Sequence, residues 1–126
     1  MSVLLDTHAF LWWCEDAPEL SKRARKTIAS EDCRISLASL WEMAVKIGLG
    51  KLKLPARFDR YVPEQMERNG FSPLEIGFRH VARYATLPWR HRDPFDRLLV
   101  AQALEEGLAL VSRDEVLEEY GARRIW

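Results

Sequence analysis

The sequence predicts an α/β fold, a three-layer α/β/α sandwich whose central, mostly parallel sheet carries helices on both faces. Short apolar runs, of which 3–5 and 108–111 are the clearest, have the length and composition of buried strands. The segments between such runs repeat apolar side chains at helical spacing and begin with residues that cap helices. Buried strands that alternate with helices are typical of parallel sheets, because a crossover helix returns the chain to the same edge.

The expected elements follow one another in a regular order. Those of the first half are a strand at 3–5, a helix over 7–14, a basic helix capped by Ser21 that reaches about residue 30, a strand at 34–36, a helix capped by Ser39 that ends near Gly48 and Gly50, and a helix from 54 to about 68. Those of the second half are an edge strand within 71–76, a helix over 79–86, a loop over 87–93, a helix from 94 to Gly107, a strand at 108–111, a short helix over 114–120 and a possible strand at 122–126.

Length and composition indicate one soluble domain, residues 1–126. Apolar residues make up 48% and charged residues 30%, which excludes the disordered and membrane classes. The opening residues reach an acid too soon for a signal peptide, so we expect a cytoplasmic protein without a membrane span. Cys14 and Cys33 lack the spacing of a zinc site and are expected to be buried thiols.

The net charge of zero, from 19 basic and 19 acidic residues, does not by itself indicate a nucleic-acid-binding protein. A basic rim around an acidic centre would also sum to zero. Segments 22–26 and 90–92 are rich in Arg and Lys and could form such a rim. The alternative for each is a solvated helix face or loop.

Four acids stand where helices and strands meet on the predicted sheet. Asp6 directly follows the first strand, and Asp114 follows the strand 108–111 after two residues. Glu42 and Asp96 are expected in the first turns of their helices. Ligands of open parallel sheets bind outside the carboxyl ends of the strands, so the four carboxylates are predicted to converge on one crevice.

Clustered carboxylates raise one another's pKa and repel, which is unfavourable without a cation. Their oxygens suit Mg²⁺ or Mn²⁺, which keep positions open for water and phosphate. Each acid could instead cap its helix, with Glu42 completing a capping box with Ser39. Capping and metal binding are compatible. Asp93 competes with Asp96 for the site, but we expect Asp93 to be the N-cap and Asp96 to project freely.

Several ordered segments resemble the PIN-domain ribonucleases, and within them the VapC toxins of bacterial toxin–antitoxin pairs. The resemblance covers essentially the whole chain. The matching segments are Leu4-Leu5-Asp6-Thr7-His8, residues 36–42 (SLASLWE), residues 46–52 (KIGLGKL), residues 91–103 (HRDPFDRLLVAQA) and Leu110-Val111-Ser112-Arg113-Asp114. The resemblance implies a PIN-like fold and an acidic site at Asp6, Glu42, Asp96 and Asp114, with Thr7 and Ser112 assisting. It also implies RNA cleavage with Mg²⁺ or Mn²⁺, a homodimer, and inhibition by a VapB antitoxin.

The roles that follow are hypotheses. Asp6, Asp96 and Glu42 would hold the metal, with Asp114 completing the site, and a metal-activated water would attack phosphorus without a covalent intermediate. Arg97 and Arg113 are candidates for phosphate contacts; the alternative is a salt bridge within the cluster. His8 and His91 lack metal-ligand spacing, and Trp12, Trp13 and Trp41 are expected in the core or at a dimer contact. Trp89 is the tryptophan most suited to touch RNA or an antitoxin.

The sequence therefore predicts a VapC-like endoribonuclease whose acidic crevice is also the place that an antitoxin blocks. One alternative is an RNA-processing nuclease of the same fold without an antitoxin. Another is a non-catalytic binding module that keeps the acids for a structural metal. Metal-dependent RNA cleavage distinguishes the enzyme readings from the module.

Overall fold

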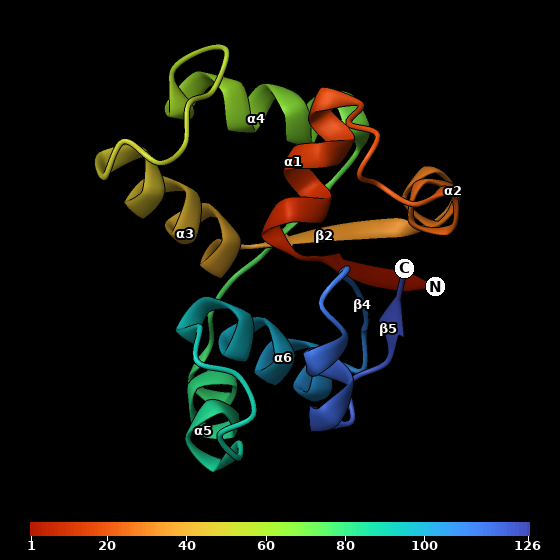
Figure 1. The fold of residues 1–126 in the computed structure, drawn as a ribbon, viewed down its shortest axis with the longest axis vertical. Helices are drawn as coiled ribbons and strands as arrows, with labels where there is room; N and C mark the ends of the chain where they lie inside the picture. The colour runs from red at the N-terminus through yellow and green to blue at the C-terminus, as the bar shows by residue number, and fades with distance from the viewer.

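A computed structural model describes all residues, 1–126, and Figure 1 shows its elements. The strands are β1 (Ser2–Leu5), β2 (Asp32–Ser36), β3 (Ser72–Leu74), β4 (Ala109–Val111) and β5 (Arg124–Ile125). The helices are α1 (Thr7–Glu15), α2 (Lys22–Ser30), α3 (Leu37–Gly48), α4 (Phe58–Asn69), α5 (Phe78–Thr86) and α6 (Pro94–Glu106), and a 3-10 helix spans Glu115–Tyr120. None of the helices is long and apolar enough to cross a membrane.

All strands join one sheet in the order β3-β2-β1-β4-β5, and every pair is parallel. The predicted parallel sheet is therefore confirmed. The central strand β1 pairs with β2 on one side and with β4 on the other, and Leu5 stands opposite both Ile35 and Val111. The short strand β3 lies at the edge, as Pro73 in it predicts.

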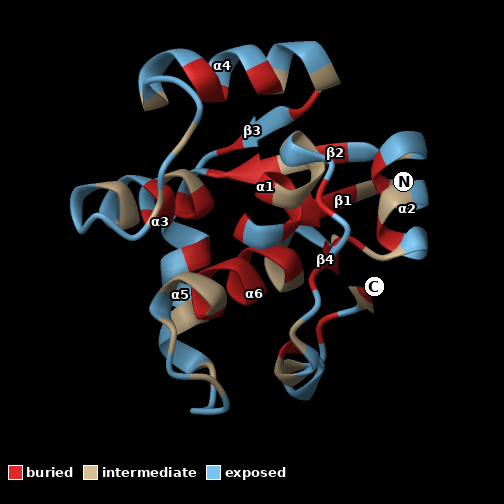
Figure 2. Cartoon of the chain, turned by 45° about the horizontal axis from the view of Figure 1, so that its top comes forward, coloured by how far each residue is buried: buried red, intermediate tan, exposed pale blue.

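Two apolar clusters, one on each face of the sheet, form the core. Successive side chains of a strand point to opposite faces, so Val3 and Leu5 join a cluster with α1, α2 and α4, while Leu4 joins a cluster with α6. Figure 2 shows the buried residues concentrated in the sheet and along α6, with the outer faces of α2 and α4 exposed. The three-layer α/β/α arrangement is confirmed.

The chain runs from β1 to β2 and β3 on one side of the sheet, and then returns to β4 and β5 on the other side. The direction changes between β1 and β4, whose carboxyl ends lie side by side. The backbone N–H of Asp6 donates to the carbonyl of Val111 at 3.0 Å, which holds these two ends together. This is the crevice in which ligands of open α/β sheets bind.

Two expectations about helix starts are wrong. Ser36, not Ser39, caps α3: its Oγ accepts from the backbone N–H of Ala38 at 2.9 Å. Ser39 is buried with its hydroxyl unpartnered, so the expected capping box with Glu42 does not form. The helix expected from residue 54 begins only at Phe58.

The two cysteines are free thiols, as expected. Cys33 is buried, whereas Cys14 is only half-buried. Desolvation raises the pKa of each thiol to about 12, which keeps both protonated and unreactive at neutral pH.

Candidate metal centre

Asp6 and Asp114 stand at the adjoining ends of β1 and β4, where the sequence predicts them. Asp6 caps α1 by accepting the N–H of Ala9 at 2.8 Å, and the hydroxyl of Ser112 also bonds its carboxylate. Asp114 caps the 3-10 helix by accepting the N–H of Val116 at 3.1 Å. Each acid thus caps a helix and lines the same pocket. Asp6 and Asp114 can therefore cap a helix and belong to the candidate site at the same time.

Asp96 reaches the same pocket from the first turn of α6. Asp93 is the N-cap of this helix, and its Oδ1 accepts the N–H groups of Phe95 and Asp96 at 2.8 and 3.3 Å. The carboxylate of Asp93 is hydrogen-bonded to these backbone N–H groups, whereas Asp96 lines the pocket together with Asp6 and Asp114. Asp93 lines a separate hollow beside α3.

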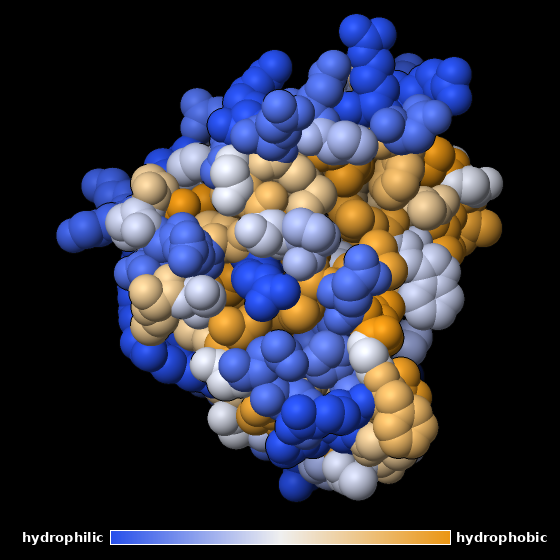
Figure 3. Space-filling model, turned by 180° about the vertical axis from the view of Figure 1, so that it is seen from behind, coloured by the Kyte–Doolittle hydropathy of each residue, from blue (hydrophilic) through white to orange (hydrophobic).

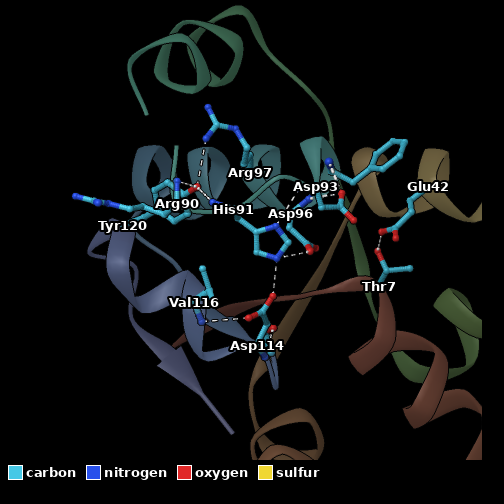
Figure 4. Close-up of polar contacts among 12 residues, drawn as sticks. Thr7, Glu42, Arg90, His91, Asp93, Asp96, Arg97, Asp114, Val116 and Tyr120 are labelled. Atoms are coloured by element: carbon cyan, nitrogen blue, oxygen red, sulfur yellow. Dashed lines mark hydrogen bonds and ion pairs between the residues drawn. The ribbon is translucent and has the colours of Figure 1, made fainter. Parts of the chain in front are cut away.

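Glu42 lies in the second turn of α3, not in the first as expected, and it does not line the pocket of the other three acids. Its Oε1 accepts the hydroxyl of Thr7 at 2.6 Å (Figure 4). Its Oε2 forms an ion pair with Lys46 at 2.7 Å. Only 3% of Glu42 is exposed, so both carboxylate oxygens are satisfied inside the protein. Thr7 therefore orients Glu42, and Lys46 balances its charge.

His91 is a site residue that sequence reasoning set aside. Its Nε2 lies 2.7 Å from Oδ2 of Asp114 and 3.3 Å from Oδ2 of Asp96, as Figure 4 shows. Its Nδ1 accepts the backbone N–H of Asp93 at 3.0 Å, which fixes Nε2 as the nitrogen that faces the acids. Ligand atoms of His91, Asp96 and Asp114 all lie within 4.8 Å of one another.

The only sequence signal for His91 is its position two residues before the N-cap of α6, in the loop that enters the site. Tyr120 holds this loop in place, because its hydroxyl accepts the backbone N–H groups of Arg90 and His91 at 3.0 and 2.7 Å. Tyr120 lies 29 residues away from His91 in sequence, so its role could not be predicted.

Burial and mutual repulsion govern the pKa values of the carboxylates in the pocket. Burial raises the pKa of Asp6 despite its hydrogen bonds from Ser112 and Ala9. Burial, and then the charges of Asp93, Asp6 and Glu42, raise the pKa of Asp96 to about 7. Without a cation, part of the repulsion is therefore relieved by a proton on Asp96.

The pocket has a volume of about 330 Å³ and is lined by Asp6, His8, Trp12, Asp96, Arg113 and Asp114. Three carboxylates converge on it, and Nε2 of His91, which carries the ring proton because Nδ1 accepts the N–H of Asp93, donates to Asp114 at its edge. Carboxylate oxygens are donors that Mg²⁺ or Mn²⁺ accepts, and the open pocket leaves room for water and phosphate oxygens. The residues present fit a divalent metal ion.

The two predicted arginines differ in position. Arg113 is exposed at the pocket, forms no ion pair, and has its guanidinium carbon 4.8 Å from the centre of the Trp12 ring. Arg97 is 3% exposed and lies between Tyr84 and Trp89, where it donates to the carbonyl of Pro88 at 2.9 Å. Arg97 therefore neither faces the pocket nor pairs with its acids, and the expectation of a phosphate contact is corrected.

Two tryptophans and one basic segment lie at or next to the pocket. Trp89 is 74% exposed next to the site, in keeping with a contact to RNA or a partner. Trp12 lines the pocket and also packs against the core, so the expected core contact is confirmed in part. Of the two basic segments, 90–92 lies beside the site, whereas Arg25 within 22–26 pairs with Asp16.

The family model of the PIN domain matches residues 3–123. The ribonuclease VapC22 of Mycobacterium tuberculosis is 28% identical over 123 residues, which cover 94% of this chain and 92% of that protein. The ribonuclease VapC16 of the same organism is 46% identical over 48 residues; this match covers 38% of this chain and about a third of that protein, 34%.

Two solved structures have the same fold over nearly the whole chain. VapBC of Salmonella typhimurium bound to DNA matches with a TM-score of 0.72 at 20% identity and covers 98% of this chain and 96% of that one. VapBC2 of Rickettsia felis bound to a promoter fragment matches with a TM-score of 0.72 at 15% identity, covering 98% and 97%. At these identities the similarity establishes the fold.

Proposed function

This chain belongs to the PIN-domain family, and we propose that it is a divalent-metal-dependent endoribonuclease that acts as the toxin of a toxin–antitoxin pair. One observation carries the proposal: Asp6, Asp96 and Asp114, from three separate parts of the chain, line a single pocket at the switch point of the sheet. The similarity to VapC22 along nearly the whole chain supports the choice of RNA as substrate.

In the proposed mechanism Asp6, Asp96 and Asp114 hold Mg²⁺ or Mn²⁺, and Glu42 completes the acidic site. The bound metal supplies an activated water and shields the charge of the phosphodiester. Ser112 orients Asp6 through a hydrogen bond, and Thr7 orients Glu42. The RNA would be hydrolysed in one displacement at phosphorus: the water oxygen forms the new P–O bond, the ribose oxygen leaves with a proton, and no covalent enzyme intermediate forms.

Arg113 is proposed to bind the substrate phosphate. It is exposed at the pocket and unpaired, so its guanidinium is free to accept an anion. Lys46 lies in the neighbouring hollow beside His8 and Trp12, but it forms an ion pair with Glu42.

The proposal includes a VapB-like antitoxin and a homodimer. The structural neighbours from Salmonella typhimurium and Rickettsia felis are VapBC proteins, which supports a partner of the VapB kind. A stripe of exposed apolar side chains on one side of α3 supports a protein interface; its members are Leu37, Trp41, Val45 and Leu49. Figure 3 shows exposed apolar side chains on the side of the molecule where α3 lies.

We assign the stripe on α3 to the homodimer. Trp41 is 57% exposed and packs edge-on against Phe95, so it offers a rigid aromatic anchor for a partner. Light scattering tests this: a dimer that Trp41→Glu converts to a monomer supports the assignment, and a Trp41→Glu dimer contradicts it.

The proposed enzyme is a single domain that acts in the cytoplasm. Its RNA substrate is found in the cytoplasm, and free thiols such as those of Cys14 and Cys33 are usual in that compartment.

The central experiment measures cleavage of bulk cellular RNA by the purified protein. Cleavage that requires Mg²⁺ or Mn²⁺, stops on chelation and is lost in Asp6→Asn supports the nuclease. A protein that binds metal without cleaving any RNA would instead be the non-catalytic module. An RNA-processing enzyme would instead have no neighbouring antitoxin gene. Small proteins that co-purify with it would not inhibit its activity.

A further inference from the structure

His8 and Trp12 form an aromatic pair at the edge of the acidic pocket. They are four residues apart on α1, so they lie on the same helix face. Their rings stack with centres 5.1 Å apart and planes 29° from parallel. Helix α1 begins directly after Asp6, which places this pair next to the candidate metal centre.

The pair faces the pocket as well as the core. Trp12 is half-buried, packs against the core and lies near Trp126, whose ring centre is 5.9 Å away, whereas His8 is exposed; both line the polar pocket. The neighbouring Trp13 shows what a structural tryptophan does here: its ring packs near Phe71, and its Nε1 donates to Asn69 at 3.0 Å. Trp12 has no such bond to the protein.

Two hollows meet at the His8–Trp12 pair. The acidic pocket includes Arg113, whose guanidinium lies 4.8 Å from the Trp12 ring centre. A second hollow of about 200 Å³ is lined by the same two rings, by Lys46 and Lys51 and by Glu15. The two rings therefore belong to both hollows, and each hollow contains at least one cation.

Aromatic rings beside cations match what single-stranded nucleic acid requires. Cations follow its backbone phosphates, and exposed rings stack on its bases whatever their sequence. A duplex would hide its base faces, so the arrangement favours an unpaired strand. The acidic pocket of about 330 Å³ is within the usual size of small-molecule sites, roughly 300–1,000 Å³.

We propose that the His8–Trp12 pair is a nucleotide subsite, on which a base next to the scissile phosphate of single-stranded RNA stacks. Arg113 contacts the phosphate in the acidic pocket, and Lys51 contacts the strand in the second hollow. This proposal rests on the proposed nuclease function and adds where the RNA binds and by which interaction.

The test separates base stacking from catalysis. Binding of a short fluorescein-labelled single-stranded RNA is measured in the Asp6→Asn background, after the parent enzyme has located the cleavage position in that RNA. Trp12→Leu is expected to weaken binding about 5- to 100-fold, as the loss of one base stack does. Trp12→Phe, which keeps a ring, should restore most of the affinity. Phe78→Leu removes an exposed ring on α5, outside both hollows, and should not change it.

A paired change identifies the base. Replacing one nucleotide beside the cleavage position with an abasic residue should weaken binding to the protein with Trp12 but not further weaken binding to Trp12→Leu. His8→Ala, at an exposed position that the fold does not need, should show part of the same effect. In the cleaving enzyme these variants should raise KM and leave kcat nearly unchanged.

The outcomes distinguish the two proposals. If the parent cleaves RNA but abasic substitution costs the same affinity with and without Trp12, the subsite is wrong and the nuclease stands. A change in kcat alone for His8→Ala and Trp12→Leu would also overturn the subsite. A parent protein that neither binds nor cleaves RNA would contradict both.

Discussion

The imidazole of His91 contacts Asp114, with Nε2 2.7 Å from Oδ2. The same nitrogen lies 3.3 Å from Asp96, so His91 joins two acids that belong to different elements. Because Nδ1 accepts the backbone N–H of Asp93, Nε2 carries the proton of the neutral ring and donates to these acids. His91 therefore orients carboxylates that would hold the metal, without being a ligand itself.

We expect His91→Ala to weaken Mn²⁺ and Mg²⁺ binding alike, by about tenfold, because the carboxylates lose the donor that orients them. Titration of Mn²⁺ followed by electron paramagnetic resonance, with Mg²⁺ as competitor, measures both. His8→Ala is the matched control, because His8 lines the same pocket outside the cluster of His91, Asp96 and Asp114. A loss confined to Mn²⁺ would instead indicate that the imidazole binds the metal directly, and no loss for either metal would exclude an orienting role.

Asp96 should make the stability of the metal-free protein depend on pH. Its pKa is about 7 in the folded protein, against an ordinary value of 3.8, so the folded state binds a proton more tightly than the unfolded state. The free energy of unfolding should therefore fall as pH rises from about 4 to about 7. Urea unfolding in the presence of chelator measures this slope.

Asp96→Asn should reduce that slope, because the amide does not titrate; the remaining slope is expected from Asp6, whose pKa burial also raises. Excess Mg²⁺ should also reduce it in the parent protein, since the metal stabilises the carboxylate form. An unchanged slope in Asp96→Asn would show that another group accounts for the pH dependence.

Asp6→Asn should lower RNA cleavage on the order of 100-fold or more while keeping the fold. Asn is as good an N-cap as Asp, so the hydrogen bond from Ala9 survives, and removing one buried charge relieves repulsion. The melting temperature without metal should be equal to that of the parent or higher. Parent-like cleavage in Mg²⁺ would exclude Asp6 from the catalytic site.

Arg97→Lys should lower the free energy of unfolding by about 1–3 kcal/mol, because lysine leaves the buried acceptors around it incompletely bonded. Those acceptors are the carbonyl of Pro88 and the hydroxyl of Tyr120, at 2.9 and 3.2 Å. The salt dependence of RNA binding should not change. Arg113→Gln is the counterpart, expected to leave stability unchanged and to reduce the slope of log K against log salt by about one.

The helix α6 shows how much of the site local sequence specifies. Asp93 as N-cap, Pro94 at the first position and Asp96 in the first turn all lie where the sequence predicts. Capping depends on a few neighbouring residues, so it can be read locally. The start of α3 shows the limit, because Ser36 and Ser39 are both suitable caps, and the choice depends on Gln102, which bonds Ser36 from α6.

Local patterns along the chain were sufficient to place Asp6 after β1, Asp96 in the first turn of α6 and Asp114 after β4, since strand ends and helix caps are short-range features. Only the tertiary structure brought His91 to Asp114, Trp12 to the pocket and Arg97 into the interior. Adjacent residues of a helix point about 100° apart, so Arg97 faces away from the pocket that Asp96 lines. Whether a side chain contacts another segment depends on how parts of the chain that are distant in sequence pack together, and local sequence does not determine that packing.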